Sequence, residues 1–143
     1  MTSIGDEARQ PAEAIAPEAL PAGPRERFAY SYGVRAGRML WISGQVALNA
    51  EGAIVGVGDV GTQAAQAFDN LRAVVEAAGG TLDDVVATTT YMVDRADSQT
   101  INEVRRRYLT GAVKPTSTLL VVAGLARPEF LVEIEAVAVL GRH

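Results

Sequence analysis

The sequence predicts an α+β domain with the element order β-β-α-β-α-β-β, in which two helices pack on one face of a mixed sheet. Residues 62–78 repeat apolar side chains at three- and four-residue spacing, which is typical of an amphipathic helix. Residues 85–93 are β-branched and alternating, and residues 132–139 alternate in the same way, which is typical of strands. A chain of 143 residues is long enough for one domain with a substantial core.

The composition excludes several classes of function. The chain has no cysteine, and its one histidine, His143, is the last residue, so we expect no thiolate nucleophile, no histidine-dependent triad and no cysteine-based or ordinary zinc site. The net charge of −4 argues against nucleic-acid binding. No apolar run approaches the roughly 18 residues of a membrane helix, so no membrane contact is expected. No secretory leader is recognisable, and we expect a cytoplasmic protein.

Residues 1–24 are rich in alanine, proline and glutamate and show no lasting periodicity. The prolines interrupt any helix, so this segment is interpreted as a flexible N-terminal arm with one helical turn near Glu13–Ile15. An alternative is that the arm packs on a neighbouring subunit. The folded domain is then expected to span residues 25–143.

The first two strands are predicted to form a hairpin. Residues 28–35 alternate and are rich in aromatic side chains, and residues 39–43 (MLWIS) form a compact apolar run. The turn at residues 36–38 contains Gly37, which suits a tight reversal. Gly44 follows the second strand directly, which indicates a bulge or a close approach of the backbone to another group.

The two helices have recognisable ends. Thr62 can cap the first turn of the first helix, and Gly79–Gly80 ends it. The second helix is expected to begin at Asp97 or Ser98 and to run to about Leu109.

Residues 115–140 are interpreted as two strands joined by a short loop. In the second of these strands one face is wholly apolar, whereas the other carries Glu133 and Glu135 among leucine and valine. One interpretation is that a neighbouring subunit or a ligand covers the carboxylate face; the alternative is an edge strand that meets water at both glutamates. Because two helices cover only one face of a sheet, burial of the other face by oligomerisation is expected.

Four stretches in this order resemble the Rid superfamily, the reactive-intermediate deaminases, which are also called the YjgF family. They are Ala36-Gly37 followed by MLWISGQVAL, then AFDNLRAVVEAAGGTLDDVVATTTYMVD, INEVRRRYL and LVEIEAVAV. The resemblance runs from about Tyr30 to Leu140. It implies a chorismate-mutase-like fold and a homotrimer whose sheets form a central barrel, with three clefts between subunits.

The resemblance also implies an activity and a site. Enzymes of this family hydrolyse reactive 2-imino or enamine acids to 2-keto acids and ammonia without a metal or organic cofactor. Matching by motif assigns Glu133 to the glutamate that holds the attacking water. The substrate-binding residues implied are Tyr30, Ser43, Gly44 and Asn102. Purely structural roles remain open for two of these residues. Tyr30 can be an aromatic residue of the core, and Asn102 can be a residue of the helix surface.

The sequence departs from the family at one position. Deaminases of the family carry an arginine that clamps the substrate carboxylate two residues after the proline of the penultimate strand. Here Ser117 stands at that position, and a hydroxyl cannot replace a fixed cation. Lys114 and Arg127 are alternative sources of the missing charge, and Ser117 can equally be a plain strand hydroxyl.

These observations favour a cofactor-free hydrolase or deaminase of a small reactive imine or enamine, with a substrate preference altered by Ser117. The alternative is a non-catalytic homotrimer that binds a small metabolite or assists a partner enzyme. A ribonuclease activity is disfavoured by the acidic charge balance and by the absence of a histidine pair.

Overall fold

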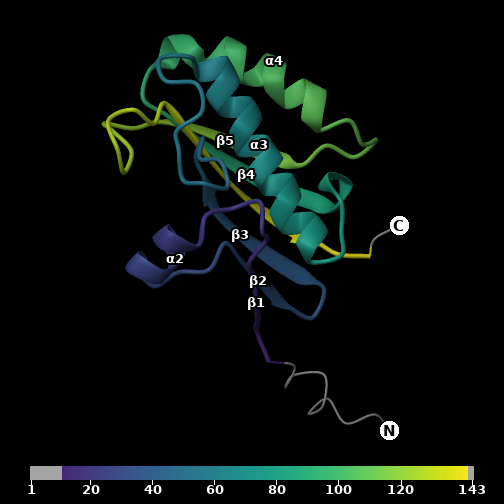
Figure 1. The fold of residues 1–143 in the computed structure, drawn as a ribbon. Helices are drawn as coiled ribbons and strands as arrows, with labels where there is room; N and C mark the ends of the chain where they lie inside the picture. The colour runs from purple at the N-terminus through teal and green to yellow at the C-terminus, as the bar shows by residue number, and fades with distance from the viewer. Residues whose placement is uncertain (1–10, 142–143) are drawn as a thin grey trace, which may run out of the picture.

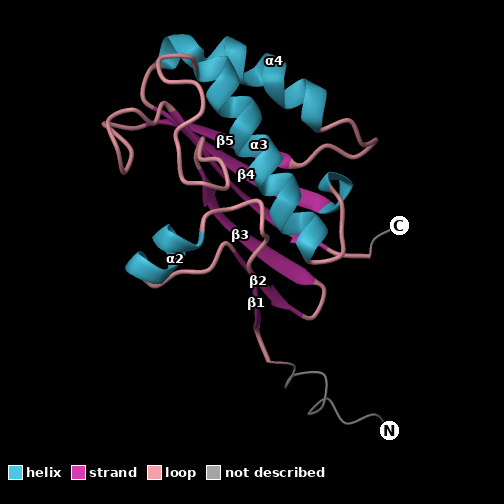
Figure 2. Ribbon diagram, viewed as in Figure 1, coloured by secondary structure: helices cyan, strands magenta, loops and turns pink. Residues whose placement is uncertain are grey.

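The computed structural model describes residues 11–141 as one sheet of six strands, with two long helices packed across one of its faces (Figure 1). The strands are β1 (Glu13–Ile15), β2 (Gly33–Ala36), β3 (Met39–Gln45), β4 (Val85–Met92), β5 (Thr116–Val121) and β6 (Val132–Val139). The helices are α2 (Ala22–Phe28), α3 (Val60–Ala77) and α4 (Ser98–Tyr108), with single 3-10 turns at Leu82–Asp84 and Arg95–Asp97 (Figure 2). The predicted α+β class and mixed sheet are confirmed.

The strand order β1-β2-β3-β6-β4-β5 places β6 in the middle of the sheet, between β3 and β4. All neighbouring strands are antiparallel except β4 and β5, which are parallel. The last two strands, β5 and β6, are therefore not neighbours, and the segment between them crosses one end of β4. The register of β3 on β6 shifts between Ile42 and Gln45, so the bulge predicted around Gly44 is confirmed.

The core lies between the sheet and helices α3 and α4. Along β6 every second side chain is buried, and these are the four apolar residues of the face predicted to meet a core. They are Val132, Ile134, Ala136 and Ala138. From α3, Phe68, Leu71 and Val74 pack against this face. Burying such side chains contributes about 1.5–3 kcal/mol each, which fixes the helix on the sheet.

The start of α3 differs from the prediction. Asp59, rather than Thr62, is the N-cap: its carboxylate accepts hydrogen bonds from the Thr62 amide at 3.1 Å and the Thr62 hydroxyl at 2.8 Å. An aspartate before the first turn caps as well as threonine does and also carries a charge that favours the positive end of the helix dipole.

The N-terminal segment is more ordered than its prolines indicated. The helical turn expected near Glu13–Ile15 is wrong: these residues form β1, which pairs with β2, and Ile15 is buried. A strand was expected to start at Phe28, but this residue ends α2. The first ten residues of the predicted arm and His143 lie outside the described part of the chain, and the domain boundary at residue 24 stays a prediction.

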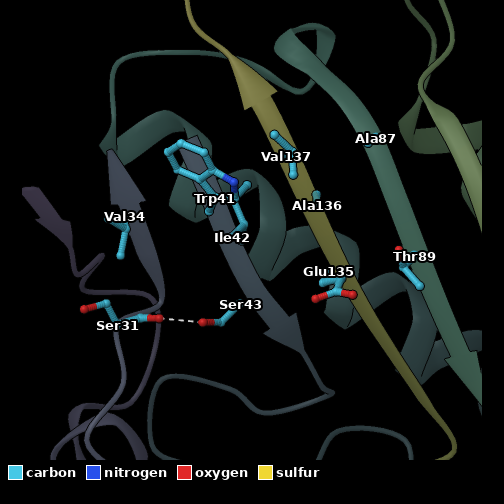
Figure 3. A pocket seen from close by; sticks show the side chains of 10 residues that line it. All are labelled: Ser31, Val34, Trp41, Ile42, Ser43, Ala87, Thr89, Glu135, Ala136 and Val137. Carbon is cyan, nitrogen blue, oxygen red and sulfur yellow. Dashed lines mark hydrogen bonds between the residues drawn. The ribbon is translucent and has the colours of Figure 1, made fainter. Parts of the chain in front are cut away.

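The face of the sheet opposite the helices carries no covering element within residues 11–141 (Figure 1). Trp41 stands on this face with 47% of its surface exposed, and every residue of the edge strand β5 is exposed. Trp41, Val137 and Glu135 project from β3 and β6 toward a shallow cavity of about 370 Å³ (Figure 3). In the described segment no helix has the length and apolar character needed to cross a membrane.

Candidate functional site

A second and larger hollow lies at the end of the sheet where β3 ends and β6 begins, with a cavity volume of about 660 Å³. Four residues selected from the sequence line it together: Tyr30, Ser43, Gly44 and Glu133. We call this hollow the cleft. It is open to solvent on the side where α2 and the loop between β5 and β6 form its rim.

Glu133 lies directly over the backbone of Gly44. A Cβ atom built on Gly44 would stand 2.5 Å from Oε1 of Glu133 and 2.9 Å from its Cγ, closer than real side chains approach. The missing side chain at Gly44 therefore makes room for the carboxylate, and the bulge in β3 brings this backbone up to it. The close approach expected at Gly44 has Glu133 as its partner.

The carboxyl group of Glu133 is half-buried, and this burial raises its pKa because ionisation costs more away from water. The neighbouring Glu135 raises the pKa of Glu133 further by charge repulsion. Glu135 itself accepts a hydrogen bond of 2.5 Å from the hydroxyl of Tyr91, which lies opposite Glu133 on β4. The two glutamates therefore have different surroundings: Glu135 is hydrogen-bonded, whereas Glu133 faces the cleft.

Tyr30 stands in the wall of the cleft with 39% of its surface exposed. The core aromatic residue is its neighbour Tyr32, which is buried and donates a hydrogen bond to the carbonyl of Pro21. The two rings meet edge to face with centroids 5.7 Å apart. Burial, chiefly, and the charge of Glu133 raise the pKa of Tyr30, so this hydroxyl stays protonated and can donate a hydrogen bond to a ligand in the cleft.

Ser43 is held by two hydrogen bonds to the chain that precedes β2. Its amide donates to the carbonyl of Tyr32 at 2.9 Å, and its hydroxyl donates to the carbonyl of Ser31 at 2.5 Å (Figure 3). The hydroxyl proton is therefore engaged within the protein, and Ser43 presents its backbone and its oxygen lone pairs at the border between the cleft and the open sheet face.

Two buried polar residues of α3 hold the cleft walls, and the sequence analysis missed both. Asn70 donates to the carbonyls of Val46 at 3.0 Å and Leu48 at 2.9 Å, both in the wall. Gln63 donates to the carbonyl of Glu129 at 2.8 Å and accepts from the Leu131 amide at 2.9 Å. The available signal was their seven-residue spacing, which puts two amide side chains on the helix face that otherwise packs in the core.

Asn102 and Ser117 do not join the cleft within one chain. Ser117 pairs with Thr88 of β4, so it lies on the helix-covered side of the sheet, whereas Glu133 projects from the opposite side. Asn102 is half-buried on α4, on that same helix-covered side. Ser117 and Glu133 therefore do not face a common space within one chain.

Lys114 and Arg127, the two alternative sources of positive charge, lie in different parts of the structure. The ammonium group of Lys114 donates to the carbonyls of Leu109 at 3.0 Å and Gly111 at 2.7 Å, which fixes it at the end of α4. Arg127, in contrast, lines the cleft, as does Arg27 of α2. Among residues 11–141 there is no group of three or more acidic or histidine side chains placed to hold a metal ion.

The cleft thus combines one half-buried carboxyl group of raised pKa, a tyrosine hydroxyl and exposed arginines. A carboxyl group whose pKa is raised is a stronger base than an exposed carboxylate, so it can accept a proton from water and return it. A residue with this property in a cleft is a candidate for catalysis, and the arginines give the site a preference for anions.

Comparison with known proteins identifies the family. Residues 22–140 match the family model described as Endoribonuclease L-PSP. The mouse 2-iminobutanoate/2-iminopropanoate deaminase is 39% identical over 78% of this chain and 82% of its own length. A RutC family protein of Pyrococcus horikoshii is 36% identical over 82% of this chain and 88% of its own.

A solved structure agrees in sequence and in fold. The YjgF gene product of Escherichia coli superimposes with a TM-score of 0.79 at 37% identity, over 92% of this chain and 99% of that protein. The fold described above is thus shared with that protein over nearly the whole of both chains. The chain belongs to the Endoribonuclease L-PSP family, that is, the Rid superfamily of YjgF-like proteins.

Proposed function

We propose that the protein hydrolyses reactive imines or enamines to the corresponding keto compound and ammonia, without a cofactor. The observation that carries this proposal is Glu133: a half-buried carboxyl group of raised pKa that lies over the Gly44 backbone and faces a cleft. The similarity to the mouse 2-iminobutanoate/2-iminopropanoate deaminase supports this reaction class.

The chemistry needs little more than a placed water and a proton carrier. An iminium carbon is already electrophilic, so water attacks it while the Glu133 carboxylate takes a proton from that water, and a C–O bond forms. Glu133 then returns the proton to nitrogen. The C–N bond breaks with its electron pair leaving on ammonia, while the new hydroxyl gives its proton to the Glu133 carboxylate and the carbonyl forms. Glu133 then passes this proton to the departing ammonia or to solvent, which restores the carboxylate. One water is consumed and one ammonia is released, with no change of oxidation state.

The homotrimer belongs to the same proposal. Its support is the uncovered sheet face, where Trp41 is exposed, together with the wholly exposed strand β5. In a trimer, Ser117 and Asn102 of a neighbouring copy would complete the cleft, which explains why neither lies near Glu133 in the single chain. Large exposed apolar surfaces of this kind are typical of contacts between subunits.

The decisive test is Glu133→Gln, assayed by keto-acid formation from 2-imino acids generated in the reaction mixture. We expect the rate to fall at least about 100-fold, since general acid–base groups contribute 10²–10⁴-fold. Glu103→Gln removes an exposed carboxylate of α4 and serves as the matched control. Full activity in the Glu133→Gln protein would exclude this role for the cleft.

A non-catalytic, metabolite-binding trimer is the second candidate, and Ser117 favours it because an exposed hydroxyl stands where family deaminases carry a cation. Tight binding of keto acids without turnover of any imine would support it. A small-molecule ligand is common to both candidates, and the cytoplasmic location stays a prediction.

A further inference from the structure

We propose that the cleft selects substrates that carry both a carboxylate and a large apolar side chain, with Arg27 and Arg127 as the residues that recognise the carboxylate. This inference rests on the proposed function, whose site it shares. It names the substrate class as 2-imino acids with aromatic or branched side chains, and it places the cations in the same chain as Glu133.

The first step is the position of the two cations. Arg27 comes from α2 and Arg127 from the loop between β5 and β6, and both side chains line the cleft. Within residues 11–141 the ion pair joins Arg72 and Asp69, and neither arginine of the cleft takes part in an ion pair there. Guanidinium groups of this kind present several donors in a plane, which suits a carboxylate.

The second step is that both arginines are placed by aromatic rings. The guanidinium carbon of Arg27 lies 5.8 Å from the centroid of Phe28, and that of Arg127 lies 5.6 Å from the centroid of Phe130. A cation over a ring face is held electrostatically while its N–H groups stay free to donate. Two segments far apart in the sequence thus each contribute an arginine beside a phenylalanine ring to the lining of the cleft.

The third step is the separation of charge within the cleft. Glu133 is half-buried in the wall, whereas Arg127 is exposed at the rim. An imino acid can therefore turn its carboxylate toward the arginines and its imine carbon toward Glu133. The reverse orientation would place the substrate carboxylate against Glu133, where like charges repel. The arginines consequently orient the substrate as well as attract it.

The fourth step is the apolar surface of the walls. Val46, Leu48, Tyr30 and Phe130 line the cleft, and Phe28 adds a ring that is 67% exposed. A volume of about 660 Å³ greatly exceeds what a three-carbon imino acid fills. Apolar walls gain free energy only when an apolar group covers them, so a large side chain is favoured over a methyl group.

Isothermal titration calorimetry on the full chain tests this with products, so no turnover is needed. The ligands are phenylpyruvate, its methyl ester and pyruvate. The proteins are the wild type, the double variant Arg27→Gln/Arg127→Gln and the control Arg106→Gln/Arg107→Gln, which removes two exposed arginines of α4. Both double variants lower the net charge equally, so they separate a local effect from general electrostatics.

We expect the wild type to bind phenylpyruvate at least about tenfold more tightly than pyruvate, because burying a phenyl group is favourable. The Arg27→Gln/Arg127→Gln protein should bind phenylpyruvate about tenfold or more weakly, since bonds to charged groups are among the stronger ones. It should bind the methyl ester as the wild type does, and the control should match the wild type throughout.

Two results would overturn the inference: equal binding of phenylpyruvate by the wild type and by the Arg27→Gln/Arg127→Gln protein, or pyruvate bound as tightly as phenylpyruvate. Its failure is separable from that of the proposed function. Arginine-dependent binding by a protein that turns over no imine would refute hydrolysis and support the ligand class. Turnover that depends on Glu133 but not on the two arginines would support hydrolysis and refute carboxylate recognition by the arginines.

Discussion

The carboxylate of Glu133 occupies the space that a side chain at position 44 would need, since a Cβ on Gly44 would stand 2.5 Å from Oε1 of Glu133. The register shift between Ile42 and Gln45, within the pairing of β3 with β6, lies at this contact. A local feature of the sheet therefore sets where the proposed proton carrier lies. The position of the carboxylate can be changed without touching Glu133 itself.

Gly44→Ala is the first prediction. The added methyl group forces the flexible end of Glu133 aside, while the sheet and core stay in place. Because a displacement of about 1 Å can cost 10²-fold in rate, we expect imine hydrolysis to fall about 10- to 100-fold with little change in melting temperature. Initial rates and thermal unfolding on the same preparations measure both.

Gly124→Ala is the matched control, because a Cβ at Gly124 meets nothing within 4 Å. This variant should keep the wild-type rate. If Gly44→Ala also retained it, the contact between the glycine and the carboxylate would have no bearing on the reaction.

The second prediction concerns the pH dependence of stability. Burial raises the pKa of Glu133 above its ordinary value of 4.5, so the folded chain holds this proton at pH values where the unfolded chain has released it. This difference does not lower the free energy of unfolding below pH 4.5. The free energy of unfolding falls as the pH rises through the pKa that Glu133 has in the folded chain. Relative to the wild type, Glu133→Gln should therefore gain stability between pH 4.5 and neutrality.

Urea unfolding across this pH range, at one protein concentration, gives the difference in free energy. Glu103→Gln removes an exposed carboxylate of α4 and is the control for loss of a surface charge. A difference for Glu133→Gln that does not change with pH would mean that the cleft does not desolvate this carboxyl group.

The fold could be predicted from the sequence wherever periodicity and burial agree. The alternation of β6 and the apolar stripe of α3 determine which faces meet, and both predictions are confirmed. β1 was missed because its three residues are too few for a pattern, and only pairing with β2 makes them a strand. The insertion of β6 between β3 and β4 is a long-range pairing that no local signal records.

The residues of the site could also be predicted only in part, because some of their contacts depend on long-range structure. Tyr30, Ser43, Gly44 and Glu133 were found by their motifs, and the cleft gathers them. Gln63 and Asn70 were missed because a helix position alone does not show which loop carbonyls an amide will reach. That Ser117 faces away from Glu133 follows from the registers of β5 and β6 on β4, which no local pattern in the sequence records.

Gln63→Ala is the third prediction. Gln63 is fully buried and bridges Gly56, Glu129 and Leu131, so its removal leaves buried backbone groups without partners. We expect a loss of about 2 kcal/mol or more in the free energy of unfolding. Gln99→Ala, at an exposed position of α4, should change it by less than about 0.5 kcal/mol. Equal effects of the two substitutions in urea titrations would contradict the bridging role.

Ser117→Arg is the fourth prediction. The wild type should hydrolyse 2-iminopropionate poorly, and the variant should raise that rate about tenfold, the value expected for one charge-assisted contact. Ser117→Gln adds similar bulk without charge and should leave the rate unchanged. Rapid turnover of 2-iminopropionate by the wild type would show that the serine does not limit small substrates.

The fifth prediction is the assembly state. Light scattering should give three times the 15.1 kDa chain mass for the wild type, because the face that carries Trp41 needs a cover. Trp41→Glu places a charge on that face and should reduce the mass to that of one chain. Val57→Glu, at a loop residue that is 69% exposed, should leave the trimer intact.

The Trp41→Glu protein also separates the two sources of charge at the cleft. Arg27 and Arg127 belong to the same chain as Glu133, whereas position 117 can reach Glu133 only from another copy. A dissociated Trp41→Glu protein should therefore keep arginine-dependent binding of phenylpyruvate, and in this background Ser117→Arg should no longer raise the rate on 2-iminopropionate. Retention of that gain in a monomer would show that residue 117 reaches the cleft within its own chain and that the trimer is not needed to complete the site.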